Sequence, residues 1–209
     1  MKRKSSVTYL GIELDVNLSF RDHVNKVLKK CAGRLGFLYR NSSFLSESCR
    51  KILCNALIQS QLDYCCSAWY SSVSKCLLAK LDVFQRRLVR FVLSKSSLYH
   101  VTTQDLRNLS WLSIPDRVKY FRLVHVFKIK HGRAPDYLTT NFNPLHQCHS
   151  HLTRGSQHNY HLSKDMANCP TSFAFTAIKS WNELPTDLKE IRFEHVFKSR
   201  LKEYLFSSY

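Results

Sequence analysis

Residues 21–39 read RDHVNKVLKKCAGRLGFLY, and this stretch decides the fold class. Its apolar residues recur every three or four positions, which is the spacing of one face of an α-helix. On another face, Lys26, Lys30 and Arg34 follow one another at intervals of four. The pattern predicts an amphipathic helix with one apolar face and one basic stripe. The apolar residues are Val24, Val27, Leu28, Cys31, Leu35 and Leu38.

Two more helices follow this one. Ser46 is a good capping residue and predicts the start of a helix that runs toward Leu62 and continues as far as Trp69. Its expected inward residues are Cys49, Ile52, Leu53, Ala56 and Leu57. A third helix is predicted over residues 74–93, and Arg86, Arg87 and Arg90 gather on the arc opposite its apolar face. Its expected buried residues are Leu77, Leu78, Leu81, Phe84, Leu88 and Val92.

In the second half of the chain, predicted helices are separated by a long loop. Pro115 in a first turn and Gly132 as a stop predict a helix between them. Residues 133–171 lose periodicity and hold three of the five prolines, so we expect a loop or linker there. A short helical stretch over residues 172–181 and a last helix with an apolar side follow. That side holds Phe193, Val196, Phe197, Leu201 and Tyr204.

The segment VTYLGIEL at residues 7–14 is rich in β-forming residues and predicts a short strand or hairpin interrupted by Gly11. A lone strand cannot satisfy its own ladder, so we expect it to pair with a sheet preceding Met1. The fold class is therefore mainly α, with a short N-terminal β element, a helical bundle and a small C-terminal helical unit.

Charge points to the class of partner. The chain has 32 Lys and Arg against 15 Asp and Glu, a net charge of +17 and a pI near 9.7. Such an excess favours a polyanionic partner, and the alternative is a charge that only solvates the surface. The sequence contains no long apolar run, and its first four residues are not followed by an apolar stretch. We therefore expect an intracellular protein, nuclear or cytoplasmic, without a membrane span. The eight cysteines lack a CxxC pair and are expected to be reduced and mainly buried.

Several short segments follow one another in a distinctive order. They are YLGI at 9–12, LSFRDHV at 18–24, KKCAGRLGFL at 29–38, LDYCCSAW at 62–69, LDVFQRR at 81–87, SF at 172–173, WNELP at 181–185 and FK at 197–198. Together and in this order, they resemble segments of LINE-type, non-LTR retrotransposon reverse transcriptases of the broad CR1 and jockey kind.

The resemblance implies the end of the palm, the thumb and the C-terminal tail of such an enzyme. It implies a primer-grip-like strand at 1–16 carrying Tyr9, Leu10 and Gly11, a thumb-like helical domain at 17–132, a linker at 133–171 and a helical unit at 172–209. The complete enzyme would need Mg²⁺ held by paired aspartates. None of the nine aspartates here is adjacent to another, so we expect no catalysis and no cofactor.

A thumb holds template and primer mainly by their backbones, so the resemblance implies a basic face for RNA, DNA or an RNA–DNA hybrid. Its expected contact residues are Lys26, Lys30, Arg34, Arg86, Arg87 and Arg90. For each set, a solvated surface face is the alternative. Trp69 and Trp111 are expected in the core, with stacking on bases as the less favoured alternative.

Two other hypotheses were weighed. Histidines and cysteines at 146–169 are zinc-ligand types, but their spacing fits no finger, and no metal is expected. No GxSxG elbow supports nucleophilic catalysis. From a different class of function, the chain could be a helical nucleic-acid-binding or adaptor protein that docks through residues 181–204.

Overall fold

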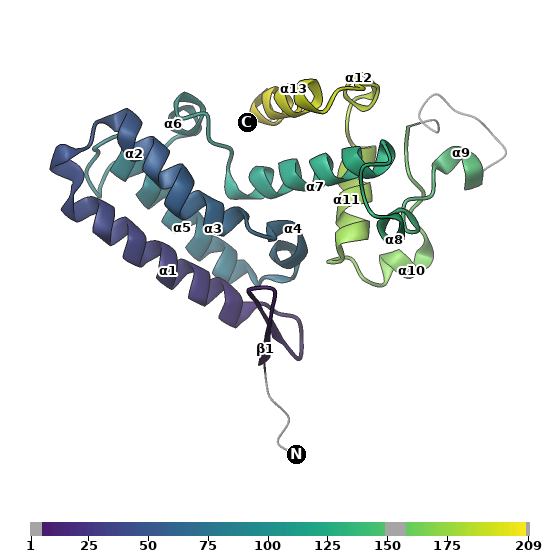
Figure 1. The fold of residues 1–209 in the computed structure, drawn as a ribbon, viewed down its shortest axis with the longest axis horizontal. Coiled ribbons are helices and arrows are strands. Elements are labelled where there is room, and N and C mark those ends of the chain that lie inside the picture. Colours follow the sequence, from purple (N-terminus) through teal and green to yellow (C-terminus); the bar gives the residue numbers. More distant parts are fainter. Residues whose placement is uncertain (1–5, 149–157, 208–209) are drawn as a thin grey trace, which may run out of the picture. The chain divides into compact units, whose positions relative to one another are not determined.

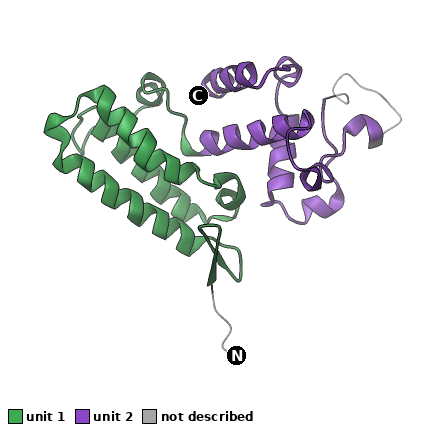
Figure 2. Cartoon of the chain, in the orientation of Figure 1, with its two compact units in different colours: residues 1–114 green, residues 115–209 purple. Residues whose placement is uncertain are grey.

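The chain is mainly helical in the computed structural model, which describes residues 6–148 and 158–207 (Figure 1). It divides into two compact units, residues 1–114 and residues 115–209 (Figure 2). A two-stranded hairpin opens the first unit, and helices make up most of the remaining described residues. The predicted fold class is confirmed.

The hairpin consists of β1 (Ser6–Tyr9) and β2 (Ile12–Asp15), which pair in antiparallel register. Leu10 and Gly11 connect them with φ values of 46° and 81°. A two-residue hairpin turn favours these left-handed values because they match the twist of the strands. Gly11 adopts its φ freely, whereas the side chain of Leu10 makes that conformation costly. The partner of β1 is therefore β2, so the hairpin, one of the two predicted alternatives, is confirmed.

Three helical segments form the core of the first unit and contact one another in pairs. The first and third, α1 (Arg21–Arg40) and α5 (Lys75–Val92), lie within one residue of their predicted bounds at each end. Between them run α2 (Glu47–Cys54), the π-helix η2 (Asn55–Gln59) and α3 (Ser60–Asp63) as one continuous segment. The buried apolar side chains of the two long helices are Val24, Cys31, Leu35, Leu38, Leu77, Leu81, Phe84, Leu88, Val89, Phe91 and Val92.

The predicted inward face of the middle segment is wrong. Ser46 does cap α2, because its Oγ accepts from the Cys49 N–H at 3.3 Å. Ile52 is nevertheless exposed, and the buried apolar residues are Cys54, Ile58 and Leu62. Apolar residues lie on both sides of this helix, and the run at intervals of four faces α1 and α5. The helix also ends at Asp63, before Trp69, because Cys65 adopts a left-handed φ of 49°.

Shorter elements complete the first unit. They are η1 (Ser42–Phe44), α4 (Cys66–Trp69), η3 (Tyr70–Ser72) and α6 (Thr103–Asn108). α6 begins with a capping box, in which the side chains of Thr102 and Asp105 each accept from the other's backbone N–H. The Tyr99 hydroxyl also donates to Asp105, at 3.0 Å. These bonds fix the chain between α5 and α6.

The second unit is built on α7 (Ile114–Lys130), which begins and ends where Pro115 and Gly132 predicted. The Phe127 ring stacks on Phe197, with 4.5 Å between ring centroids, and buried Trp181 lies against Phe197. α7 thus packs with the C-terminal helices, whereas the sequence reading grouped it with residues 17–132. These helices are α11 (Phe173–Asn182), α12 (Thr186–Lys189) and α13 (Glu194–Ser207).

The predicted linker is structured in its described part. It contains the one-turn helices α8 (Asp136–Thr139), α9 (Leu145–Cys148) and α10 (Lys164–Ala167). Tyr160 is held by the Asn182 side chain, whose Oδ1 accepts from the Tyr160 N–H at 3.0 Å and whose Nδ2 donates to its carbonyl at 2.8 Å. This segment is therefore part of the second unit's packing.

The cysteines match the prediction only in part. The structure describes the side chains of seven cysteines, all of them free thiols, and Cys31, Cys54 and Cys66 are buried. Burial raises the pKa of Cys31 to about 11 and that of Cys54 to about 12. The other four of these thiols are exposed, at positions 49, 65, 76 and 169. The expectation of mainly buried thiols is therefore wrong.

Candidate nucleic-acid interface

The predicted basic stripe of α1 separates into three different environments. Lys26 forms an ion pair with Glu13 of β2, which lowers the pKa of that carboxyl. Arg34 is partly buried and its Nη1 donates to the carbonyl oxygen of Leu57. Lys30 is exposed and has no ion pair or hydrogen bond within the described part of the chain. Of the three, only Lys30 has a side-chain charge without a partner among the described residues.

Arg34 contacts the π-helix η2. In a π-helix each backbone N–H bonds to the carbonyl five residues earlier, one residue further than in an α-helix. Leu57 and Ile58 lie in η2, and their carbonyls accept from Arg34 Nη1 and, at 3.9 Å, from the Cys31 thiol. Arg34 therefore has a structural role between α1 and η2.

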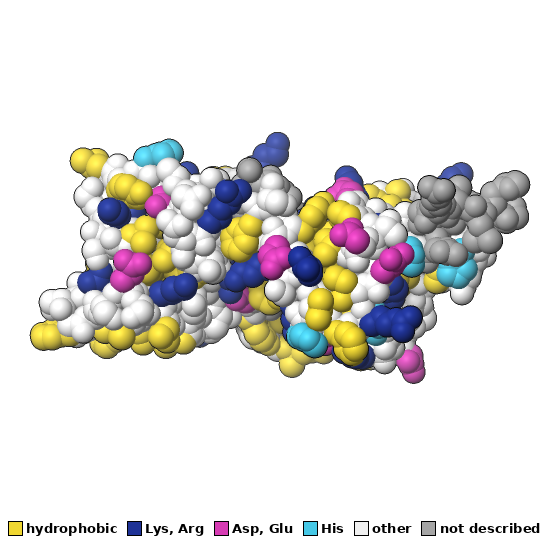
Figure 3. All heavy atoms as spheres, turned by 90° about the horizontal axis from the view of Figure 1, so that it is seen from above, with side chains coloured by type: hydrophobic (Ala, Val, Ile, Leu, Met, Phe, Trp, Pro, Cys, Tyr) yellow, Lys and Arg dark blue, Asp and Glu magenta, His cyan; other side chains and the backbone are white. Residues whose placement is uncertain are grey.

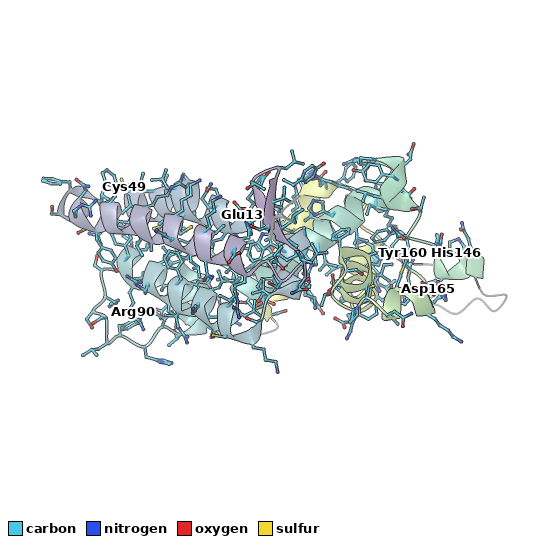
Figure 4. The ribbon with its side chains drawn as sticks, turned by 90° about the horizontal axis from the view of Figure 1, so that it is seen from below. Glu13, Cys49, Arg90, His146, Tyr160 and Asp165 are labelled. Atoms are coloured by element: carbon cyan, nitrogen blue, oxygen red, sulfur yellow. The ribbon has the colours of Figure 1, made fainter. Side chains whose placement is uncertain are left out.

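The arginines of α5 divide in a similar way. Arg86 and Arg87 are exposed, and Asp82 lies close enough to Arg86 for its carboxylate to interact with the guanidinium. Arg90 is partly buried, and its Nε donates to the Tyr99 carbonyl at 2.8 Å. Figure 4 labels Arg90 on α5 and Glu13 on the hairpin, at different ends of the first unit. Arg90 thus anchors the chain after α5, while Arg86 and Arg87 point their charges to solvent.

A groove of about 280 Å³ between α1 and α5 brings basic residues of both helices together. Lys29 lines it from α1, and Lys80 and Arg87 line it from α5. Leu28, Ala32, Val83 and Phe84 complete its lining. Within the described residues the three cations form no ion pair and no hydrogen bond, so their charges are available to a ligand.

Of these three cations, only Arg87 is among the residues predicted from the sequence. In the sequence, Lys29 and Lys80 each resemble an isolated surface charge. A signal for Lys80 was present, since it lies seven positions before Arg87 and therefore on the same face of α5. No signal within one helix could have placed Lys29 opposite them, because the groove exists only once α1 and α5 pack together.

A second hollow, of about 530 Å³, lies at the N-terminal ends of α1 and α5. Asp15 and Asp22 both line it. Hydrogen bonds from the Ser19 backbone lower the pKa of Asp15, so this carboxylate is charged at neutral pH. Two carboxylates make this hollow a poorer site for a phosphate than the groove. On the face drawn in Figure 3, Lys and Arg side chains are scattered among apolar and uncharged ones.

The primer-grip-like residues lie at the tip of the hairpin. Tyr9 and Leu10 are 64% and 72% exposed, which leaves their side chains open to a ligand. The Tyr64 hydroxyl donates to the Leu10 carbonyl at 2.7 Å, and the Tyr64 ring lies beside Gly11. Tyr9, Leu10 and Gly11 are therefore exposed, and the turn that they form is held by Tyr64.

The two tryptophans of the first unit are in the core, as expected. Trp69 and Trp111 are each 2% exposed, which excludes stacking on a base in this conformation. The Trp69 Nε1 donates to the Tyr64 carbonyl at 3.1 Å, and its ring meets that of His23 edge to face at 5.7 Å. Segments 9–12, 18–24 and 62–69, which carry part of the resemblance, are thus linked through Tyr64, Trp69 and His23.

The histidines and cysteines of the second unit do not form a ligand set within the described residues, where no group of three or more His, Cys, Asp or Glu could hold a metal. His158 Nε2 lies 3.3 Å from a Glu190 oxygen. His149 and His151 lie outside the described residues.

The chain matches no protein family model, no curated protein and no solved structure. Among the described residues, no helix is both long and apolar enough to cross a lipid bilayer.

Proposed function

We propose that this chain is a thumb-containing part of a non-LTR retrotransposon reverse transcriptase that binds nucleic acid without polymerising it. The first unit would hold a template–primer duplex by its phosphates. Nucleotide transfer is outside the proposal because the sequence has no paired aspartates to hold the two metal ions.

The observation that carries the proposal is the groove between α1 and α5. Lys29, Lys80 and Arg87 present three uncommitted positive charges from two adjacent helices. Exposed Lys30 and Arg86 add to the charge of the same two helices. Sequence-independent binding of a polynucleotide needs just such a cluster of cations, because phosphate contacts supply most of its free energy.

A second support comes from the residues of the resemblance. Three of its segments meet around Tyr64, Trp69 and the Leu10 carbonyl. These contacts agree with the joint arrangement of hairpin and helices that the resemblance implies for the grip and thumb.

The experiment compares binding of a fluorescent RNA–DNA hybrid by the full chain and two triple variants. Lys29→Ala, Lys80→Ala and Arg87→Ala together should weaken binding at least about tenfold at low salt, since each lost phosphate contact costs affinity. The matched control is Lys164→Ala, Lys179→Ala and Arg192→Ala, which removes the same net charge from exposed positions of the second unit. If both triple variants lose the same affinity for the hybrid, binding depends on net charge alone and not on the groove, which would contradict the proposal.

The adaptor alternative is less favoured by the second unit. Trp181, Phe197 and Leu201 are fully buried in that unit's own core, so these members of the suggested docking surface are not available to a partner. An adaptor would have to use exposed residues such as Phe193 instead.

A further inference from the structure

We propose that the groove between α1 and α5 accommodates one unpaired nucleotide, with its base on the apolar floor and its phosphates on the surrounding cations. This inference rests on the proposed function, because it concerns the same site. It adds that the preferred ligand is a duplex with a single-stranded end or a strand that is not paired.

The floor of the groove is the first argument. Leu28, Ala32, Val83 and Phe84 line the groove together with the three cations, and Val83 is 50% exposed, whereas Phe84 is buried. A paired duplex presents phosphates and sugars to a protein surface and keeps the faces of its bases stacked inside. An apolar floor therefore contributes little to duplex binding, whereas an unpaired base can cover it and remove it from water.

The arrangement of charge is the second argument. Lys80 and Arg87 lie seven positions apart on α5, about 10 Å along the helix axis. Lys29 lies on the other wall, on α1. Cations therefore flank the floor on both walls, and a nucleotide carries a phosphate on each side of its sugar. A neutral small molecule, or an acidic one with a single anionic group, would form ion pairs with fewer of these cations.

The volume is the third argument. About 280 Å³ is near the lower end of the volumes of ligand pockets, which begin at roughly 300 Å³. A site of this size suits a single nucleotide unit of a longer strand. A partner helix needs a longer groove that accepts side chains over several turns. The size and the three cations thus favour a nucleotide over an acidic amphipathic helix.

The test uses the full chain and two hybrids with equal numbers of phosphates, one blunt and one with a short single-stranded tail. The wild type should bind the tailed hybrid at least about fivefold more tightly, since contact with one base contributes on the order of 1 kcal/mol. Ala32→Trp fills the groove from an exposed position without changing charge. It should abolish the preference for the tail, which is measured as the ratio of the dissociation constants of the two hybrids.

The matched control is Ala79→Trp, which adds the same side chain to an exposed position of α5 that does not line the groove. It should keep the preference. Val83→Ser, which removes apolar floor without adding bulk, should reduce the preference in the same direction as Ala32→Trp. Circular dichroism and thermal unfolding check that each variant folds.

The outcomes separate the two proposals. Equal binding of both hybrids by the wild type, or a preference that survives in both Ala32→Trp and Val83→Ser, overturns the nucleotide site and leaves the proposed function standing. Displacement of the tail by an acidic amphipathic peptide at comparable concentration assigns the groove to a protein partner and also overturns it. Failure to bind either hybrid overturns the proposed function itself.

Discussion

The hydroxyl of Tyr64 donates a hydrogen bond of 2.7 Å to the carbonyl oxygen of Leu10, which lies 54 residues earlier in the chain. This bond ties the tip of the hairpin to the segment between α3 and α4. Leu10 has a φ of 46°, a conformation that is costly for leucine, so the turn depends on support from outside. Tyr64 supplies that support through both its hydroxyl and its ring.

Tyr64→Phe should destabilise the hairpin selectively. The ring contact beside Gly11 remains, while the hydrogen bond is lost, which costs about 1 kcal/mol. Hydrogen exchange should show faster exchange of the amides of β1 and β2 and unchanged exchange in α5. Uniform change across the first unit, or none in the hairpin, would contradict the anchoring role.

Leu10→Asn should stabilise the same turn, because asparagine adopts left-handed φ more readily than leucine and the sequence Asn-Gly favours a two-residue hairpin turn. The expected gain is about 1 kcal/mol in the free energy of unfolding, measured with urea. Leu10→Val is the matched control, since a β-branched residue is disfavoured at positive φ and should lower stability. Equal stability of the two variants would argue against the observed turn.

Arg34→Met should lower stability without changing the salt dependence of nucleic-acid binding. Methionine keeps much of the side-chain volume, but the Leu57 carbonyl in the π-helix loses its donor. A hydrogen bond from a charged group contributes about 1.5 to 3 kcal/mol. Lys30→Met on the same helix is the control and should change stability by less than about 0.5 kcal/mol, since Lys30 is exposed and unpaired within the described residues.

The opposite pattern would restore the original interpretation of the stripe. If Arg34→Met leaves the unfolding midpoint unchanged and reduces binding of a hybrid as much as Lys30→Met does, both residues act on the ligand. Thermal unfolding and fluorescence anisotropy on the same preparations distinguish the two cases.

Acid should weaken the contact between the hairpin and α1 through His23. This residue is 3% exposed, and its Nδ1 accepts from the Glu13 N–H at 3.5 Å. Burial lowers the pKa of His23, against the opposing attraction of Glu13. Because the folded pKa lies below the unfolded value of 6.5, the unfolded state takes up the proton first. The stability associated with neutral His23 is therefore present above that value and is lost as the pH falls below it.

The measurement is urea unfolding of the wild type and of His23→Phe at pH 7.5 and pH 5.5, two values chosen on either side of the ordinary histidine pKa of about 6.5. Phenylalanine preserves an aromatic contact with Trp69 and does not titrate. The loss of stability between the two pH values should be smaller in the variant than in the wild type. An identical loss would show that other groups account for the acid sensitivity.

Two glycines should respond to alanine in opposite directions. Gly33 lies inside α1, and a Cβ added there would meet no atom within 4 Å. Gly33→Ala should therefore stabilise the chain by about 0.5 to 1 kcal/mol, because alanine has the higher helix propensity. Gly132 follows α7 with a φ of 63°, so Gly132→Ala should destabilise by about 1 kcal/mol. Thermal unfolding of both variants is the measurement, and a shift of the same sign in both would contradict these helix assignments.

The parts of the fold that the sequence predicted well have strong periodicity or a clear boundary residue. Residues 21–39 and 74–93 each carry one dominant apolar face, and their helices lie where that face indicates. Pro115 and Gly132 bound α7 for reasons local to the backbone. The middle segment differs, because Ile52 and Ile58 offer two apolar faces and only packing against α1 and α5 selects between them.

The candidate site was less predictable, because its charges depend on contacts between different elements. Helical spacing placed Lys26, Lys30 and Arg34 on one stripe, but spacing within a helix does not reveal a carboxylate on the hairpin or a carbonyl on a π-helix. Glu13 and Leu57 engage two of the three. Conversely, Lys29 joins Lys80 and Arg87 only through the packing of α1 on α5.

The most direct test of the central claim, nucleic-acid binding through the groove between α1 and α5, is the slope of log K against log salt for an RNA–DNA hybrid. Each phosphate contact contributes about 0.7 to 0.9 to that slope. The triple variant Lys29→Ala, Lys80→Ala, Arg87→Ala should lose about two units of slope relative to the wild type, with unchanged circular dichroism. The control triple at Lys164, Lys179 and Arg192 should lose almost none. A slope that is the same for the wild type and the groove variant would contradict the claim.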